Sequence, residues 1–248
     1  MSGAAGAAGT ERLALVTGAG TRVGRAIALD LAARGWRVAV HYHGSGPGAD
    51  ETVAAIVAMG GRAQAFRADL SSPDGPAGLI EAVHASCGPI TALVSSAASM
   101  VCTPVGATTA ATFDAIIALN LRAPFLLAQA AVPRFTDAGA IVLIADHMGT
   151  EPWPGYVVHG VSKAGVEALA RHLAAALAPR IRVNAVAPGL VLAPDGMPPG
   201  AVARFVEDTP LGRSGAPADV ADAVAYLLEA AFVTGEVLHV DGGRRVRP

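Results

Sequence analysis

The feature that most constrains this chain is a repeated alternation of two kinds of segment. Short runs rich in Val, Ile, Leu and Ala alternate with longer Ala- and Leu-rich stretches in which apolar residues recur with a helical period. Strands of a parallel sheet are buried on both faces, so they form continuous apolar runs. The pattern therefore predicts an α/β fold, a Rossmann-like doubly wound parallel sheet with helices on both faces.

Seven strands and seven helices follow one another without a linker, which predicts a single domain over residues 11–248. We expect strands over Leu13–Thr17, Arg37–His43, Ala63–Arg67, Ala92–Ser95, Ile141–Ala145, Arg182–Ala187 and Val237–Val240. We expect helices over Val23–Arg34, Asp50–Met59, Pro76–Ser86, Thr109–Arg134, Val157–Leu177 and Pro217–Glu229, with a short helix near Ala201–Glu207.

Two segments fall outside this pattern. Residues 1–10 are rich in Gly and Ala and have neither a basic start nor a long aliphatic core, so we expect a disordered tail and no signal peptide. Gly189–Pro199 is rich in proline and glycine, which do not suit a regular element. We expect a mobile loop there, and a substrate-binding region over about 189–208.

Charge and cysteine content exclude several classes of function. The formal net charge of −2 gives no global field for nucleic acid or an anionic membrane. No run of roughly 18 apolar residues is free of charge, Pro or Gly, so we expect no transmembrane helix. Cys87 and Cys102 fit no metal-ligand spacing, so we expect no metal, and their small number suits a cytoplasmic protein.

A glycine-rich turn follows the first predicted strand and leads directly into a helix. The turn, Thr17–Gly24, reads Thr-Gly-Ala-Gly-Thr-Arg-Val-Gly. Gly18 permits a tight turn, Gly24 lets helix and strand approach, and the N–H groups at the helix start can face a pyrophosphate. Arg22 stands where a third glycine is usual, and its guanidinium can bind phosphate. The turn predicts a dinucleotide site.

The end of the second predicted strand favours NADPH over NADH. An acidic residue there would hold the ribose 2'-hydroxyl of NAD, but the sequence is His41-Tyr42-His43-Gly44-Ser45. Two imidazoles, a hydroxyl and nearby Arg22 suit a 2'-phosphate. Asp69, which precedes Leu70, is a candidate acceptor for the adenine amino group, and the alternative is that it caps the next helix.

These features, together with Asn120, Lys163, Pro188-Gly189 and the terminal Asp241-Gly242-Gly243, resemble the short-chain dehydrogenase/reductase family from residue 13 to 243. Arg22, the 41–45 stretch and Asp146 look most like its pteridine reductase branch. The resemblance implies a dinucleotide held by Gly18, Thr21, Arg22, Val23, Gly24, His41, Tyr42, His43, Gly44, Ser45, Asp69, Leu70, Ser96, Ala97, Ala98, Lys163, Pro188, Gly189 and Leu190.

The family's catalytic set is Asn, Ser, Tyr and Lys, with fixed spacing between the last three. Counting back from Lys163 places His159 at the Tyr position and Asp146 at the Ser position. Asp146 matches the pteridine branch, whereas His159 departs from the family. We hypothesise that Asp146 and His159 share the proton-donor role, that Lys163 holds the nicotinamide ribose, and that Asn120 keeps Lys163 hydrated.

Tyr156 offers an alternative phenol, since it lies one helical turn before His159. We favour a substrate-wall role for it, beside His147, Met148 and Trp153.

Three functions remain open at this point. The first is an NADPH-dependent reductase of a planar C=N or C=O substrate, with pterins or dihydrofolate leading. The second is a cofactor-binding sensor or partner protein, and the third is a non-redox enzyme that uses Asp146 and His159 as acid and base. The many small apolar residues on the helix after Lys163 suggest a homo-oligomer, a dimer or tetramer as in the family.

Overall fold

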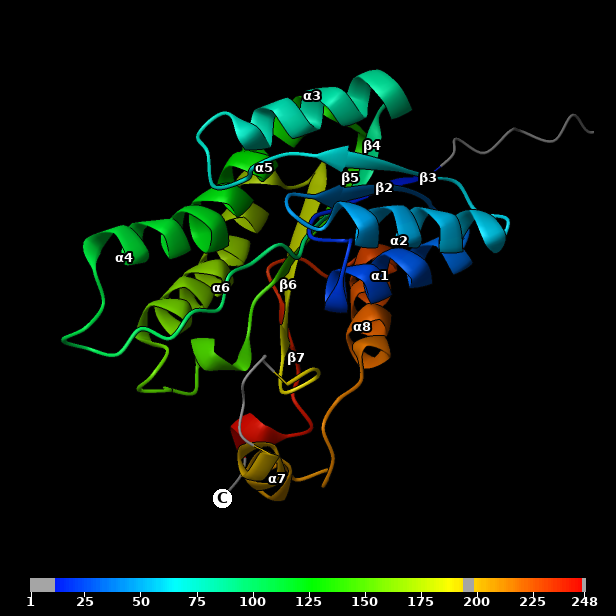
Figure 1. The fold of residues 1–248 in the computed structure, drawn as a ribbon. Helices are drawn as coiled ribbons and strands as arrows, with labels where there is room; N and C mark the ends of the chain where they lie inside the picture. Colours follow the sequence, from blue (N-terminus) through cyan, green and yellow to red (C-terminus); the bar gives the residue numbers. More distant parts are fainter. Residues whose placement is uncertain (1–11, 194–198, 247–248) are drawn as a thin grey trace, which may run out of the picture.

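The computed structural model describes residues 12–193 and 199–246, so the expected N-terminal tail and part of the expected substrate loop lie outside the described residues. Seven parallel strands form one sheet in the order β3-β2-β1-β4-β5-β6-β7 (Figure 1). The order changes direction between β1 and β4, which confirms the doubly wound prediction. The strands are β1 (Leu13–Val16), β2 (Arg37–Tyr42), β3 (Ala63–Arg67), β4 (Ile90–Ser95), β5 (Phe135–Ile144), β6 (Ile181–Pro188) and β7 (Val237–Val240).

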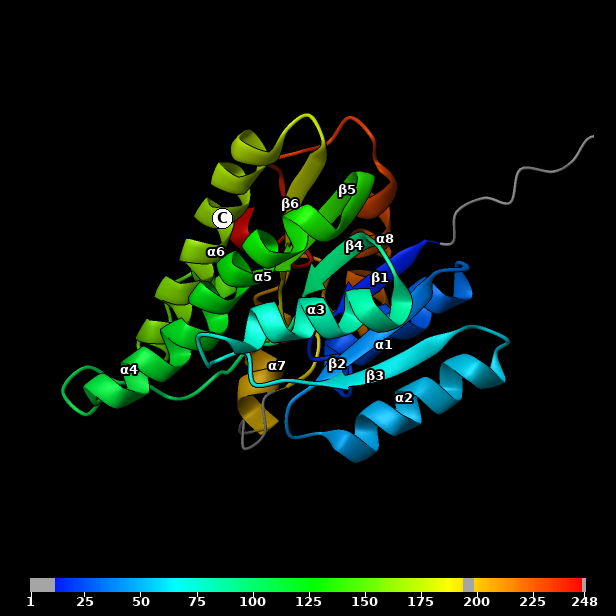
Figure 2. The same cartoon turned by 90° about the horizontal axis from the view of Figure 1, so that it is seen from above.

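Helices cover both faces of the sheet (Figure 2). One layer holds α1 (Arg22–Ala33), α2 (Gly46–Ala58) and α8 (Pro217–Glu229), and the other holds α3 (Gly75–Cys87), α5 (Ala123–Ala131) and α6 (Val157–Leu177). Two further helices, α4 (Ala110–Ile117) and α7 (Pro199–Glu207), and the short helical segments 118–122, 132–134, 147–149 and 244–246 complete the chain.

Each layer encloses its own core, and the central strands serve both. In β1, Leu13 and Leu15 pack under α3 and α5, whereas Ala14 and Val16 pack under α1 and α8. Successive side chains of a strand point to opposite faces, so a strand between two layers must be apolar throughout. All four residues of β1 are buried. Because β1 is a buried central strand, the turn that follows it leaves the sheet at the carboxyl end of that strand.

Two elements begin more than two residues before their predicted starts. β5 begins at Phe135 and not at Ile141, because Gly139 accommodates the Phe135 ring: a Cβ at Gly139 would lie 2.2 Å from Phe135 Cδ1. α2 begins at Gly46 and not at Asp50, since Pro47 occupies the first helical turn, where its missing N–H costs nothing.

The predicted helix 109–134 is one helical run whose middle is unusual. Residues 118–122 form a π-helical turn between α4 and α5. Such turns occur often at functional sites because the inserted residue shifts the side chains that follow. The turn contains Asn120.

The run 110–134 is also long and apolar enough to pass a length-and-composition test for a membrane span. Its α5 portion packs on α3 and β4, and 44% of its most apolar window is buried within the protein. A core helix of a sheet layer meets the same test, so packing against the sheet accounts for its apolar character.

Candidate active site

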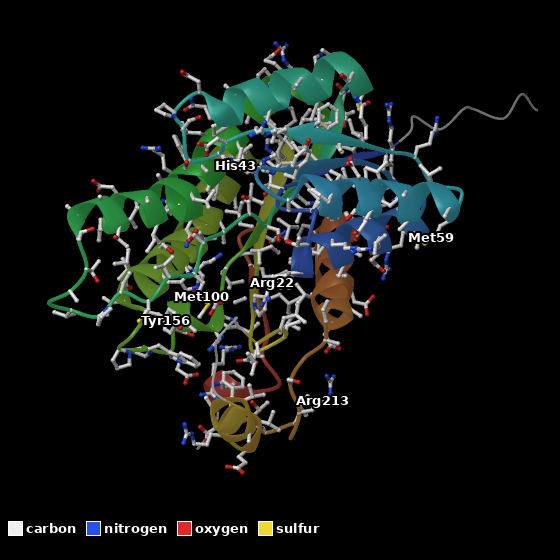
Figure 3. The ribbon with its side chains drawn as sticks, in the orientation of Figure 1. Arg22, His43, Met59, Met100, Tyr156 and Arg213 are labelled. Atoms are coloured by element: carbon white, nitrogen blue, oxygen red, sulfur yellow. The ribbon has the colours of Figure 1, made fainter. Side chains whose placement is uncertain are left out.

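A cavity of about 800 Å³ lies beyond the carboxyl ends of the strands, at the place where the strand order changes direction. All of the predicted cofactor-binding residues line it. Of the predicted catalytic residues, Asp146, Tyr156, His159 and Lys163 line it, and Asn120 does not. We call the part of the cavity lined by the glycine turn and residues 41–45 the cofactor half, and the part lined by Asp146, Trp153 and Tyr156 the substrate half. In Figure 3, His43 and Arg22 label the cofactor half, and Met100 and Tyr156 label the substrate half.

The glycine turn after β1 is a cradle that a larger residue would fill. A Cβ at Gly24 would lie 2.3 Å from Gly18 O, and a Cβ at Gly18 would lie 3.0 Å from Ala97 Cα. The Thr17 hydroxyl accepts hydrogen bonds from Ser96 N and Ala97 N, at 2.9 and 3.0 Å, and so joins this turn to the turn after β4. The shape fits a dinucleotide whose pyrophosphate faces the start of α1.

Arg22 adopts the left-handed backbone conformation, with φ of 50°, at the position where the family turn usually has glycine. A residue with a side chain pays for this conformation, so its presence at a cavity suggests a role for that side chain. The Arg22 guanidinium donates to Leu192 O and Ala193 O, at 3.0 and 3.2 Å. It therefore links the glycine turn to the start of the expected substrate loop.

His41 has a different role from the one that the sequence suggested. Its ring is buried, Nδ1 accepts from Gly18 N at 3.1 Å, and Nε2 lies 3.2 Å from Ala68 O. Burial lowers the pKa of His41 to about 4. His41 is thus a neutral brace of the glycine turn, which corrects its predicted contact with a 2'-phosphate.

His43 and Asp69 lie at the exposed end of the cofactor half. His43 Nδ1 is 3.5 Å from Asp69 Oδ1. The Asp69 carboxylate accepts from the hydroxyl and the N–H of Ser71, and these bonds lower its pKa. Since α3 begins only at Gly75, the alternative that Asp69 caps the next helix is wrong.

Lys163 projects from α6 into the floor of the cavity. Its ammonium donates to Ile144 O at 2.7 Å. Burial lowers the pKa of Lys163 to about 8, and the nearby negative charge of Asp146 opposes this shift. Lys163 is therefore protonated at neutral pH, but it loses its charge at a lower pH than a free lysine does.

Asp146 follows β5 and lies between two histidines. Its Oδ1 accepts from Met148 N at 2.8 Å and lies 3.1 Å from His147 Nδ1, whereas its Oδ2 lies 3.7 Å from His159 Nε2. Burial raises the pKa of Asp146, but the hydrogen bonds of His147 and Met148 N, together with the nearby imidazole of His159, outweigh burial and hold it below its usual range. The carboxyl group therefore favours its ionised form at neutral pH, and the proton-donor role shared by Asp146 and His159 stays a prediction.

His159 is almost fully enclosed, and its side chain is 3% exposed. Its Nδ1 lies 3.1 Å from Ser99 O, which can only accept, and 3.5 Å from Asn120 Nδ2, which can only donate, so the shorter contact favours a hydrogen on Nδ1. Its Nε2 has no hydrogen-bond partner among the described residues. Nε2 is therefore the ring atom left for proton exchange, and it faces Asp146.

Asn120 braces this arrangement. Its Oδ1 accepts from Ser99 N at 2.8 Å, and its Nδ2 donates to Ser99 O and to Ser162 Oγ, at 2.9 and 3.1 Å. The side chain thus grips the main chain of Ser99, whose carbonyl fixes His159. The expectation that Asn120 keeps Lys163 hydrated stays a prediction.

Aromatic side chains wall the substrate half. Tyr156 is half-buried, and its ring centroid is 6.2 Å from that of Trp153. Trp153 in turn meets His147 edge-on at 5.6 Å, and Phe205 of α7 meets His147 at 5.3 Å. His147, Met148 and Trp153 all line the cavity, as expected.

The sequence analysis did not identify Ser99 or Thr103. Thr103 N donates to Gly155 O at 2.7 Å, and the Thr103 hydroxyl accepts from Val158 N at 3.2 Å in the first turn of α6. The loop after β4 thus holds the start of the helix that carries His159. Neither residue can be recognised from the sequence, because each contacts residues that are far away along the chain.

Among residues 12–193 and 199–246, no group of three or more His, Cys, Asp or Glu side chains is arranged to hold a metal ion.

Known proteins match nearly the whole chain. The family model described as enoyl-(acyl carrier protein) reductase matches residues 18–245. An uncharacterised oxidoreductase of Methylorubrum extorquens is 37% identical over 94% of this chain and 98% of its own length.

Two solved structures share the fold closely. FolM alternative dihydrofolate reductase 1 from Brucella canis, complexed with NADP, has a TM-score of 0.90 and 33% identity over 96% of this chain and 95% of its own. The angucycline C-6 ketoreductase LanV with bound NADP has a TM-score of 0.90 and 32% identity over 95% of this chain and 96% of its own. The chain belongs to the short-chain dehydrogenase/reductase family.

Proposed function

We propose that this chain is an NADPH-dependent reductase that transfers hydride to a planar C=N or C=O substrate, with pterin- or dihydrofolate-like compounds favoured. The observation that carries the proposal is a single cavity with two kinds of lining. A glycine cradle lies at one end, and Asp146, His159 and Lys163 lie together at the other.

The cofactor half fits a reduced dinucleotide phosphate. Gly18, Gly24 and the start of α1 would hold the pyrophosphate, and Lys163 would hold the nicotinamide ribose. Arg22, His43 and Ser45 line the half where a 2'-phosphate would lie. The two solved relatives described above both carry NADP, which supports the same cofactor here. When bound, NADPH supplies the hydride.

In this proposal the imidazolium form of His159 supplies the proton from Nε2 when the substrate needs one, and Nδ1 keeps its hydrogen. Nδ1 is engaged by Ser99 O, and Nε2 faces Asp146 Oδ2 at 3.7 Å. The ionised Asp146 can pass the proton on or orient the substrate. Tyr156 serves as part of the substrate wall.

The planar substrate class follows from the walls and from the relatives. Trp153 and Tyr156 both line the cavity, and their ring centroids lie 6.2 Å apart. Asp146 can hydrogen-bond a ring nitrogen, which favours C=N. FolM is an alternative dihydrofolate reductase and LanV an angucycline C-6 ketoreductase, so the relatives support both a folate-like and a ketone substrate as candidates here.

The test is NADPH oxidation over a panel of dihydropterins, dihydrofolate, cyclic imines and ketones, followed by His159→Ala on the best substrate that must accept a proton. We expect turnover to fall about 10²-fold or more, with NADPH binding retained. Unchanged turnover would remove His159 from the mechanism. NADPH binding without turnover on any substrate would instead favour a binding protein or a non-redox enzyme.

We also propose a homo-oligomer, a dimer or tetramer, in the cytoplasm. Val157 and Val161 on α6 and Phe113 and Phe125 on the neighbouring helices are exposed apolar side chains. Covering them with a second copy would remove this apolar area from water. Sedimentation of the purified protein tests this, and a monomer at all concentrations would contradict it.

A further inference from the structure

We propose that the preferred substrate is an iminium ion: a planar ring whose C=N bond is already protonated or alkylated on nitrogen, and whose positive charge pairs with Asp146. This inference depends on the proposed reductase function and narrows its substrate class. The protein would then act on a cation that needs no proton from any side chain.

The first support is the geometry of the Asp146 carboxylate. Oδ1 accepts from Met148 N and faces His147 Nδ1. Among the described residues Oδ2 has no hydrogen bond, since His159 Nε2 at 3.7 Å is too distant for one. The Asp146 side chain is 23% exposed and lines the cavity, so one oxygen is available to a ligand.

The second support is the set of charges that face this carboxylate. His147 faces Asp146 from segment 147–149, and His159 and Lys163 face it from α6. The Lys163 ammonium is directed to Ile144 O. The hydrogen bonds that keep the pKa of Asp146 low keep it anionic, so the cavity offers a fixed negative charge at its substrate end.

The third support is the aromatic wall. Trp153 and Tyr156 lie beside the same end of the cavity. The faces of aromatic rings attract cations, and they do so more strongly where water is excluded. No arginine other than Arg22 lines this cavity in the part of the chain that the structure describes, so an anionic group on the substrate would find little to pair with at the substrate end.

The fourth support is the enclosure of His159 at the Tyr position. Hydride addition to a neutral ketone leaves an alkoxide that must gain a proton. A proton donor as enclosed as His159, whose side chain is 3% exposed, is poorly placed to protonate it. Hydride addition to an iminium carbon forms one C–H bond, and the C=N π electrons become the nitrogen lone pair. The product is a neutral amine, the reduced dinucleotide becomes oxidised, and no further proton is consumed.

The experiment compares three bicyclic substrates of one ring size: dihydroisoquinoline, its N-methyl iminium salt, and a tetralone. We expect kcat/KM for both nitrogen substrates to exceed that for the ketone by about 10²-fold. Below about pH 8, where Lys163 stays charged, kcat/KM for dihydroisoquinoline should follow the protonated fraction of that imine. The value for the N-methyl salt, which is cationic at every pH, should stay flat.

Asp146→Asn tests the pairing directly. We expect it to lower kcat/KM for the N-methyl salt by about 10²-fold with NADPH affinity retained, because it removes the charge and keeps the shape. Asp137→Asn, an exposed aspartate on the strand that leads to Asp146, is the matched control and should leave kcat/KM unchanged.

The outcomes separate this inference from the function on which it depends. Reduction of the tetralone or of a neutral dihydropterin in preference to both nitrogen substrates would overturn the iminium proposal and leave the reductase standing. An Asp146→Asn variant with full activity on the N-methyl salt would also overturn it. Failure to reduce any substrate despite NADPH binding would overturn the reductase itself.

Discussion

The two halves of the cavity are built by different means. The cofactor half is formed mainly by main chain: the turn at 17–24, the turn after β4 and the start of α1, all held by close contacts such as the one between Gly24 and Gly18 O. The substrate half is formed by side chains, among them Asp146, His159 and Trp153. Main-chain cradles need particular residues at fixed spacing, whereas side-chain walls accept many residues. The first half is therefore the more constrained, and the second is where chemistry can change.

Two buried histidines show the same difference between the cofactor half and the substrate half. His41 has both ring nitrogens engaged by main chain and serves the shape of the cofactor half. His159 has only Nδ1 engaged, and its Nε2 faces a carboxylate without a hydrogen bond. A histidine with both nitrogens satisfied is a brace, and one with a nitrogen left over can exchange a proton.

The largest effect is expected from Gly24→Val. The new side chain would collide with Gly18 O, which a Cβ alone would approach to 2.3 Å, so the cradle cannot keep its shape. We expect NADPH binding, measured by calorimetry, to weaken by about 10²-fold or more. Gly44→Ala is the matched control: Gly44 also lines the cavity, but a Cβ there meets nothing within 4 Å. Equal binding by both variants would refute the cradle.

Lys163→Met should lower kcat without lowering the free energy of unfolding. We expect kcat to fall by about 10²-fold because the nicotinamide ribose would lose the ammonium that holds it. A lowered lysine pKa means that the folded state resists the charge, and this cost is present in full below about pH 8 and declines as pH rises toward 10.5.

The free energy of unfolding of Lys163→Met at neutral pH, from urea titration, should therefore not fall below that of the wild type. A large loss of stability would mean that the Lys163 bond to Ile144 O outweighs the cost of burying the charge.

His41 should make the fold sensitive to acid. Its folded-state pKa is about 4 against 6.5 for a free histidine, so the unfolded state binds a proton first as pH falls. The contribution of His41 to the free energy of unfolding should decline by about 3 kcal/mol between pH 6.5 and 4. Urea titration at several pH values should give a flatter profile for His41→Gln, and the wild-type profile for His172→Gln, an exposed control on α6. Identical profiles for all three would contradict the brace.

The smallest effect is expected at Arg22. Arg22→Ser should lower the preference for NADPH over NADH by about tenfold, since it removes a phosphate-binding group from the cofactor half. Arg25→Ser is the control on the same helix, because Arg25 pairs with Glu51. A preference that stays unchanged in Arg22→Ser would leave the Leu192 and Ala193 carbonyls as the only demonstrated partners of this side chain.

The sequence predicted the cofactor half better than the substrate half, for a physical reason. Glycines at 18 and 24 and the apolar strands are local requirements of the turn and the sheet, so they can be recognised without a structure. The seven-stranded, doubly wound parallel sheet was confirmed.

The brace at His159 could not be predicted in the same way. It depends on Ser99, Asn120 and Thr103, which come from different loops and meet only in the fold. The charge state of Asp146 likewise depends on His147, His159 and Met148 N together. Residue type suggested an acid at position 146, whereas the surrounding donors make it an anion.

The central claim is that this cavity takes NADPH, and calorimetric titration of the wild-type chain with NADPH and with NADH tests it most directly. The account predicts one site per chain, with tighter binding of NADPH. Absence of heat for both nucleotides with well-folded protein, or tighter binding of NADH, would contradict it.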